Sequence, residues 1–301
     1  MDITNGLTLA QAIKDKNTPL RHYLEETFPF PQTLRRDFTE GAPELRVDSS
    51  GAPASTMGTA FDLLVRFLLD PNDVPQSARI LFSEEPNYTA VVDELAALAG
   101  RALREGGAGP VEGARAVWAL ALCVEAHRAG PAFAPLVPSL VYADRFTVQE
   151  MLTQASVEAI QELLALRSLA DTELVSRLAF PIFLGPEFDR SKRTPGRDRR
   201  LIAAEADLIA GGMLVDVKTR LGTKNKAGLR TDGLAAADLY QLLAYALLDA
   251  SDAYKITAIG IYSARYGRLV TWPLEYVAST MAGKAVDFSA ERRRIDAMLT
   301  S

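Results

Sequence analysis

Cysteine and histidine are nearly absent from this chain of 301 residues, which contains one cysteine, Cys123, and two histidines. A single cysteine excludes an intrachain disulfide, a cysteine zinc site and a four-cysteine iron–sulfur cluster. Two scattered histidines are too few for a histidine metal site. A reducing cytoplasm is therefore the expected location.

Long apolar runs and an excess of positive charge are also missing. No apolar run approaches the roughly 20 residues of a membrane span, and residues 1–16 lack a signal-peptide pattern, so no membrane partner is expected. Lysine and arginine number 33 against 38 acidic residues, giving a net charge of −5. This balance argues against a generally basic nucleic-acid coat protein. It is compatible with a local basic groove, because the field that a nucleic acid meets is local.

The stretch that organises the chain is residues 201–220, LIAAEADLIAGGMLVDVKTR. Its apolar residues interrupted by paired glycines predict two β-strands joined by a tight turn at Gly211-Gly212. Residues 213–218 form the second predicted strand. The first predicted strand includes Ile202, Leu208 and Ile209.

Charged residues interrupt the apolar pattern of this hairpin. Side chains alternate along a strand, so Asp216 and Lys218 share one face. Asp207 comes beside Asp216 if the pairing register allows it, and Glu205 lies on the same face as Asp207. Burying even an uncharged polar group without a partner costs about 2–7 kcal/mol, so folding alone explains this cluster poorly.

Three carboxylates and one ammonium suit the metal-assisted hydrolysis of a phosphodiester. Asp207, Asp216 and the backbone carbonyl of Val217 offer the hard oxygen ligands that Mg²⁺ or Mn²⁺ prefers, and Glu205 is expected to assist. A bound metal lowers the pKa of its water and neutralises charge on the phosphoryl oxygens. Lys218 then orients or deprotonates the attacking water, or stabilises the charge of the transition state directly. The alternative is a surface hairpin with an ordinary Asp–Lys ion pair.

Residues 232–249, DGLAAADLYQLLAYALLD, show the apolar spacing of a helix, with Gln241 and Tyr245 one turn apart on one face. The chain therefore carries, in this order, Acid-x-Asp-Leu-Ile, a turn, Leu-Val-Asp-x-Lys-Thr and a helix with Gln-x-x-x-Tyr. This series of motifs resembles the PD-(D/E)XK nuclease superfamily, in particular its RecB-like branch. The resemblance covers residues 183–273, with a weaker upstream element at 57–69.

The resemblance implies roles for five of these residues. Asp207 and Asp216 would bind metal, and Lys218 would be catalytic. Gln241 and Tyr245 would position DNA or the lysine.

The upstream element departs from the family pattern. Many RecB-like enzymes have Gly-x-x-x-His there, whereas Gly58 is followed four residues later by Asp62. Asp62 either supplies an outer metal contact or pairs with Arg66 one turn on, and the ion pair is the favoured interpretation.

A basic loop precedes the hairpin. Residues 190–200 carry six basic side chains against one acid, directly after a strand predicted within 181–188. A solvated loop is the simplest interpretation, but this loop joins the predicted site and is well placed to hold phosphates. Nucleic-acid contacts are predicted for the basic residues of this loop and of the loop after Lys218, namely Arg193, Arg197, Arg199, Arg200, Lys224, Lys226 and Arg230.

The expected fold class is α/β, a restriction-endonuclease-like mixed sheet flanked by helices with a large helical insertion. Three parts are predicted: an N-terminal helical part at 1–70 that contributes to the nuclease core, a helical lobe at 71–180, and the core at 181–301. Within the last part, residues 256–273 predict two further strands.

The sequence therefore predicts a divalent-metal-dependent nuclease that hydrolyses DNA. Because no motor motif is present, a helicase or ATPase is the expected kind of protein partner, and a place in a DNA-processing or antiviral defence complex follows only from the family's habits. The rival interpretation is a non-catalytic nucleic-acid-binding or scaffold subunit. Asp207, Asp216 and Lys218 weigh against it, because a binding module has no need of them.

Overall fold

A five-stranded mixed sheet lies at the centre of the computed structural model, which describes residues 7–105, 107–188 and 202–300. The strand order is β1-β2-β3-β6-β7, and only the β3–β6 pair is parallel. The strands are β1 (Ile182–Leu184), β2 (Leu208–Ala210), β3 (Met213–Lys218), β6 (Ala258–Ser263) and β7 (Arg268–Pro273). The predicted α/β class with a mixed sheet flanked by helices is confirmed.

The β2–β3 hairpin has the predicted turn and second strand, but its first strand is shorter than predicted, because β2 begins at Leu208 and does not include Ile202. Gly211 and Gly212 both have positive φ, +56° and +79°, which L-residues with a Cβ adopt only at a cost. The parallel β3–β6 pair requires a crossover, and α11 (Ala236–Leu248) supplies it. Between β3 and α11 a separate two-stranded ribbon forms from β4 (Thr223–Lys224) and β5 (Arg230–Thr231), where the sequence predicted only a loop.

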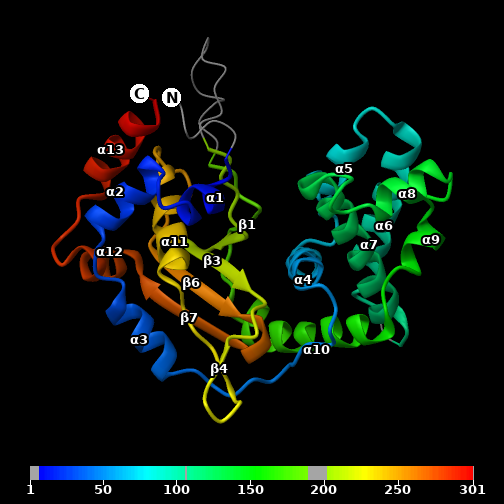
Figure 1. Ribbon diagram of the computed structural model, residues 1–301, viewed down its shortest axis with the longest axis horizontal. Helices are drawn as coiled ribbons and strands as arrows, with labels where there is room; N and C mark the ends of the chain where they lie inside the picture. Colours follow the sequence, from blue (N-terminus) through cyan, green and yellow to red (C-terminus); the bar gives the residue numbers. More distant parts are fainter. Residues whose placement is uncertain (1–6, 106, 189–201, 301) are drawn as a thin grey trace.

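Helices from both ends of the chain cover one face of the sheet. Ile209, Leu214 and Ile259 point from the strands into a core shared with these helices. Figure 1 shows them grouped beside the strands. They are α1 (Leu9–Lys14), α2 (Pro19–Thr27), α3 (Gln32–Glu40), α11, α12 (Leu274–Ala282) and α13 (Phe288–Thr300).

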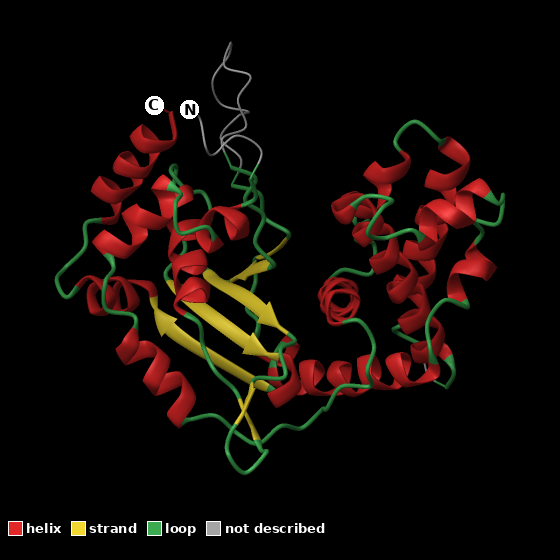
Figure 2. Cartoon of the chain, in the orientation of Figure 1, coloured by secondary structure: helices red, strands yellow, loops and turns green. Residues whose placement is uncertain are grey.

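A helical lobe covers the other face, with Leu208, Val215 and Tyr262 in its core. Figure 2 shows this lobe as an almost wholly helical half of the molecule. Phe61 of α4 stacks on Tyr262 of β6 with ring centroids 6.4 Å apart, so α4 joins the lobe to the sheet. The lobe comprises α4 (Ala54–Leu69), α5 (Gln76–Arg79), η1 (Ile80–Phe82), α6 (Pro86–Ala102), α7 (Gly109–Ala129), α8 (Leu136–Tyr142), α9 (Val148–Leu152), α10 (Val157–Glu173) and η2 (Val175–Arg177).

A buried arginine ties the lobe to the carboxyl end of β3. Arg265, in η4 (Ala264–Tyr266), forms an ion pair with Glu162 of α10, and both side chains are 3% exposed. The same guanidinium donates to the carbonyl of Thr219 at 2.6 Å and to that of Asp48 at 3.0 Å. These bonds satisfy most of the five donors of the buried guanidinium and hold the segment that leaves Lys218.

Among the described residues, no helix has both the length and the apolar character needed to cross a membrane.

Candidate functional site

The β2–β3 register brings two aspartates together. Leu208 pairs with Val215, and continuing this antiparallel register by one residue sets Asp207 opposite Asp216. Asp207 Oδ2 accepts a hydrogen bond from the backbone N–H of Val217 at 2.6 Å, which holds its carboxylate against β3. The predicted side-by-side placement of the two aspartates is therefore present in the structure.

Asp216 and Lys218 form a close ion pair on the same face of β3. Lys218 Nζ lies 2.9 Å from Oδ1 and 2.7 Å from Oδ2 of Asp216, whose side chain is 5% exposed. The Oδ2 atom is buried and has no well-directed hydrogen bond despite the short approach of the ammonium. One oxygen of a buried carboxylate therefore keeps coordination capacity for a further cation.

A third carboxylate reaches the cluster from α4. Asp62 is half-buried, and its charge is one of the causes that raise the pKa of Asp207. The close ion pair with Arg66 that the sequence favoured does not form, because Arg66 pairs with Asp73 at 2.8 Å and with Glu205 at 3.4 Å. The charge of Arg66 still opposes the effect of burial on the pKa of Asp62. Packing of the lobe against the sheet turns Asp62 inward, a placement that local helical spacing cannot reveal.

The close approach of α4 depends on a glycine. A Cβ on Gly58 would stand 3.3 Å from the hydroxyl oxygen of Thr219, the residue after Lys218. Gly58 is one turn before Asp62, so the absence of a side chain there lets the helix bring the third carboxylate to the end of β3.

Burial and mutual repulsion disfavour the ionised form of these acids. Burial, then the neighbouring acids, raises the pKa of Asp207 and of Asp216 to about 7 despite the opposing pull of Lys218. Burial likewise raises the pKa of Asp62 to about 6. The Lys218 pKa is raised as well, because the attraction of Asp216, Asp207 and Asp238 outweighs its desolvation. A divalent cation would relieve the repulsion among the acids.

Glu205 lies at the rim of the cluster. Its carboxylate is 48% exposed and contacts Arg66, while its backbone carbonyl accepts a hydrogen bond from the hydroxyl of Tyr245 at 2.6 Å. Gln241 donates to the same hydroxyl at 3.2 Å. Tyr245 and Gln241 thus hold the backbone two residues before Asp207, and the structure gives them a positioning contact.

Asp238 belongs to the site although no role was predicted for it. It lies 3.9 Å from Lys218 Nζ and 2.8 Å from a guanidinium nitrogen of Arg220. It also accepts from the N–H of Ala235 at 3.0 Å, as an acid in the first turn of a helix commonly does. The position of Asp238 in the first helical turn could be recognised from the sequence. It does not reveal that the start of α11 lies beside Lys218.

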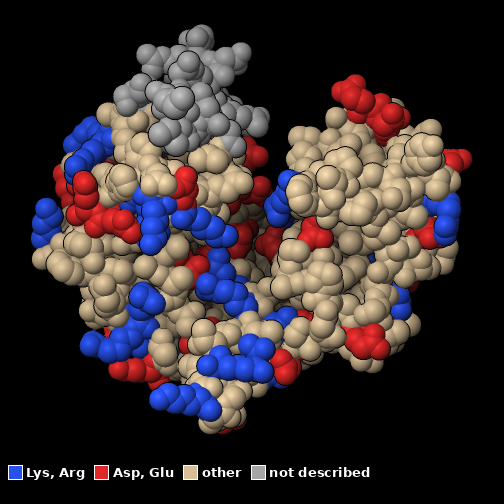
Figure 3. Space-filling view, in the orientation of Figure 1, with Lys and Arg blue, Asp and Glu red and all other residues tan. Residues whose placement is uncertain are grey.

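The predicted basic residues divide into two groups. Those on the β4–β5 ribbon follow Lys218 along the chain. Lys224 and Lys226 are exposed, and Arg230 is half-buried. Figure 3 shows Lys and Arg side chains at the lower edge of the molecule, where Figure 1 places this ribbon, and Asp and Glu side chains in the hollow between lobe and sheet. The other four, Arg193, Arg197, Arg199 and Arg200, lie outside the described residues.

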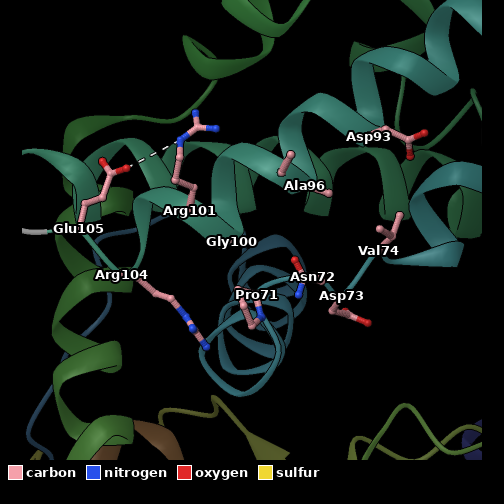
Figure 4. Close-up of a pocket in the computed structure, with 11 residues that line it drawn as sticks. Pro71, Asn72, Asp73, Val74, Asp93, Ala96, Gly100, Arg101, Arg104 and Glu105 are labelled. Carbon is pink, nitrogen blue, oxygen red and sulfur yellow. Dashed lines mark ion pairs between the residues drawn. The ribbon is translucent and has the colours of Figure 1, made fainter.

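A separate pocket of about 580 Å³ opens in the lobe between α6 and the connection from α4 to α5. Figure 4 shows Arg104 and Asp73 among its lining residues. Asp207, Asp216 and Lys218 do not line it, so this pocket is distinct from the carboxylate cluster.

The donors present fit a hard divalent cation. Within the described ranges, no group of three or more His, Cys, Asp or Glu side chains forms a metal site by itself. Asp207, Asp216 and the main chain at Val217 would therefore leave several positions to water. Mg²⁺ accepts this arrangement, because it usually keeps several waters and one or two carboxylates.

Comparison with family models, with curated proteins and with solved structures gives no match for this chain.

We expect the stability of the metal-free protein to fall as pH rises from about 4 to about 7. Asp216 has a folded pKa of about 7, whereas an unfolded aspartate titrates near about 3.9. The folded state therefore retains a proton that the unfolded state loses, and stability drops until the folded group also ionises. Urea unfolding in EDTA should show Asp216→Asn more stable than wild type above pH 7, by roughly 1–4 kcal/mol.

Asp252→Asn provides the control for this measurement. The hydrogen bond from Lys255 lowers the pKa of Asp252, so its loss should destabilise the protein above the unfolded pKa, with the opposite sign. An advantage of Asp216→Asn that stays constant from pH 4 to pH 8 would contradict the placement of Asp216 as a buried, charge-repelled acid.

Tyr245→Phe should weaken metal binding about tenfold, because outer partners that orient ligands typically matter by that factor or more. The variant loses the hydrogen bond to the carbonyl of Glu205 and, with it, about 1 kcal/mol of stability. Mn²⁺ titration followed by electron paramagnetic resonance measures the affinity.

Tyr240→Phe is the matched control, since the hydroxyl of Tyr240, five residues earlier on α11, donates to the Phe28 carbonyl at 3.3 Å. It should lose similar stability and keep wild-type Mn²⁺ affinity. Equal affinities for both variants would show that Tyr245 has a purely structural role.

Proposed function

We propose that this protein is a divalent-metal-dependent nuclease that hydrolyses DNA phosphodiester bonds. The observation that carries the proposal is the buried Asp216 with the half-buried Asp207 and Lys218 beside it, at the end of β3. Such a group costs stability in the metal-free protein, and the chemistry of phosphoryl transfer supplies a reason to keep it. The fold gives only general support, because a mixed sheet flanked by helices is compatible with a restriction-endonuclease-like core.

Asp207, Asp216 and the carbonyl of Val217 would hold Mg²⁺ or Mn²⁺. When bound, such an ion supplies Lewis acidity toward a phosphoryl oxygen and a water of lowered pKa. The hydrogen bond from the Val217 N–H orients Asp207, and the register of β2 with β3 orients Asp216. Asp62, whose charge acts on Asp207, would hold a water of the ion's outer sphere.

Lys218 is best suited to stabilise negative charge. Its ammonium sits between Asp216 and Asp238, at 2.7 and 3.9 Å, and both contacts favour the protonated form. Among the roles that the sequence leaves open for Lys218, charge stabilisation and water orientation therefore have more support than proton abstraction. Gln241 and Tyr245 would act through the backbone at Glu205, whose own carboxylate assists from the rim.

DNA is the proposed substrate because positive charge accompanies the acidic centre. Lys224, Lys226 and Arg230 follow Lys218 within one ribbon, and phosphate contacts of this kind dominate nucleic-acid affinity. The proposal includes a biological setting. The protein would act in the cytoplasm with a helicase or ATPase as its partner, and it would take part in defence against foreign DNA.

Cleavage of linear, circular and single-stranded DNA should require Mg²⁺ or Mn²⁺ and stop in EDTA. Lys218→Ala should lower the cleavage rate at least about 100-fold, because removing one electrostatic stabiliser of the transition state costs about that much. Asp216→Ala should do the same and also lose Mn²⁺ binding. The circular substrate distinguishes internal cutting from digestion of ends.

Lys284→Ala, at an exposed lysine in the loop after α12, is the control and should cut as wild type does. Cleavage that survives in both site variants would sink the mechanism. A wild type that binds DNA with metal but never cuts it would favour the scaffold interpretation.

A further inference from the structure

The β4–β5 ribbon carries an unusual concentration of positive charge. Residues 219–231 contain four basic side chains and no acid, in a chain whose net charge is −5. Arg220, at the base, is paired with Asp238. Lys224 and Lys226 have no acidic partner within the part of the chain that the structure describes. The outer half of the ribbon is therefore positively charged and open to solvent.

Two of these charges oppose each other across the ribbon. Lys224 pairs with Arg230 in the antiparallel register, which puts like charges on the same face at neighbouring positions. Like charges directly opposite destabilise a strand pair, so folding gives no reason for this choice. A polyanion lying along that face would remove the repulsion.

The tip of the ribbon is held in a defined shape. The Asn225 side chain accepts hydrogen bonds from the N–H groups of Ala227 and Leu229 at 2.9 and 3.0 Å. Asn225 N–H in turn donates to the carbonyl of Leu229 at 2.8 Å, and Gly228 takes the positive φ, +82°, that the turn requires. The backbone of the turn is therefore already ordered where it presents these side chains.

A large apolar side chain stands among the basic ones. Leu229 is 66% exposed and lies between Lys226 and Arg230 in the sequence. The base of the ribbon is anchored, since the hydroxyl of Tyr266 donates to the carbonyl of Leu221 at 2.8 Å. A Cβ on Gly222 would meet the carbonyl oxygen of Thr231 at 2.1 Å, so only glycine allows the strands to close there.

We propose that the β4–β5 ribbon binds duplex DNA by entering a groove. Lys224, Lys226 and Arg230 contact the phosphates that border the groove, and Leu229 packs against the bases or sugars inside it. The major groove of B-DNA, about 12 Å wide, admits a two-stranded ribbon, and architectural proteins insert leucine and similar side chains between base steps in the minor groove. A single strand has no groove to receive the ribbon.

The position of the ribbon suits a duplex that also reaches the carboxylate cluster. Lys226 follows Lys218 by eight residues, and this length of chain spans at most about 26 Å. That span corresponds to roughly eight base pairs at about 3.4 Å each. The inference rests on the proposed nuclease function for its substrate, but binding without cleavage tests it separately.

Fluorescence anisotropy in EDTA measures binding of a 20-base-pair DNA duplex, the matching single strand and an RNA duplex. The combined variant Lys224→Gln/Lys226→Gln should lower duplex DNA affinity at least about tenfold and reduce the slope of log affinity against log salt by about 2. Leu229→Ser should lower duplex affinity about threefold to tenfold with the salt slope unchanged, because it removes no charge. Single-strand affinity should change little in either variant.

Lys284→Gln and Ile80→Ser are the matched controls for an exposed lysine and an exposed apolar residue, and both should bind as wild type does. Equal losses of affinity for the DNA duplex and for the single strand would overturn groove binding. Tighter binding of wild type to the RNA duplex than to the DNA duplex would also overturn it. If wild type cuts DNA and the ribbon variants bind as it does, the ribbon inference fails while the nuclease function stands. If wild type cuts no DNA yet the ribbon variants lose duplex binding as described, the nuclease function fails alone.

Discussion

The register of one hairpin decides where the acidic side chains of this protein meet. Leu208 pairs with Val215, and extending this register by one residue sets Asp207, in the bend just before β2, opposite Asp216. A slip of one residue would turn Asp216 and Lys218 toward the apolar core of the helical lobe, because side chains alternate between the faces of a strand. The two-glycine turn sets this register, and the flanking β1 and β6 strands hold it on both sides.

The surrounding structure keeps a cluster that is unfavourable by itself. Burial and repulsion raise the pKa of Asp207 and Asp216 to about 7, so ionising them at neutral pH costs the metal-free protein stability. Two cores offset that cost, one on each face of the sheet. Arg265, Tyr245 and α11 each hold a segment next to the acids, so the site is built on regular elements of the fold.

Local patterns in the sequence predicted the centre of the site well. Alternation along residues 213–218 correctly put Asp216 and Lys218 on one face, and the paired glycines identified the turn. The helix with Gln241 and Tyr245 was predicted within residues 232–249, and α11 occupies Ala236–Leu248 of that range. These features depend on neighbours within a few residues, which is the range over which sequence periodicity carries information.

Contacts between distant segments were not predictable in the same way. The orientation of Asp62 depends on how α4 packs on the sheet, and the proximity of Asp238 to Lys218 depends on the crossover. The β4–β5 ribbon was missed because two residues per strand are too few to show alternation. Its like-charge pair, Lys224 with Arg230, became visible only once the register was known.

The most direct test of the account is to locate the metal itself. Crystals grown with Mn²⁺ should give an anomalous difference peak between Asp207 and Asp216, next to the carbonyl of Val217. The same crystals of Asp216→Asn should lack that peak while the β2–β3 hairpin keeps its register. A peak elsewhere, or an intact Asp207–Asp216 pair that stays without Mn²⁺ at saturating concentration above pH 7, would contradict the assignment of this carboxylate pair as a metal centre.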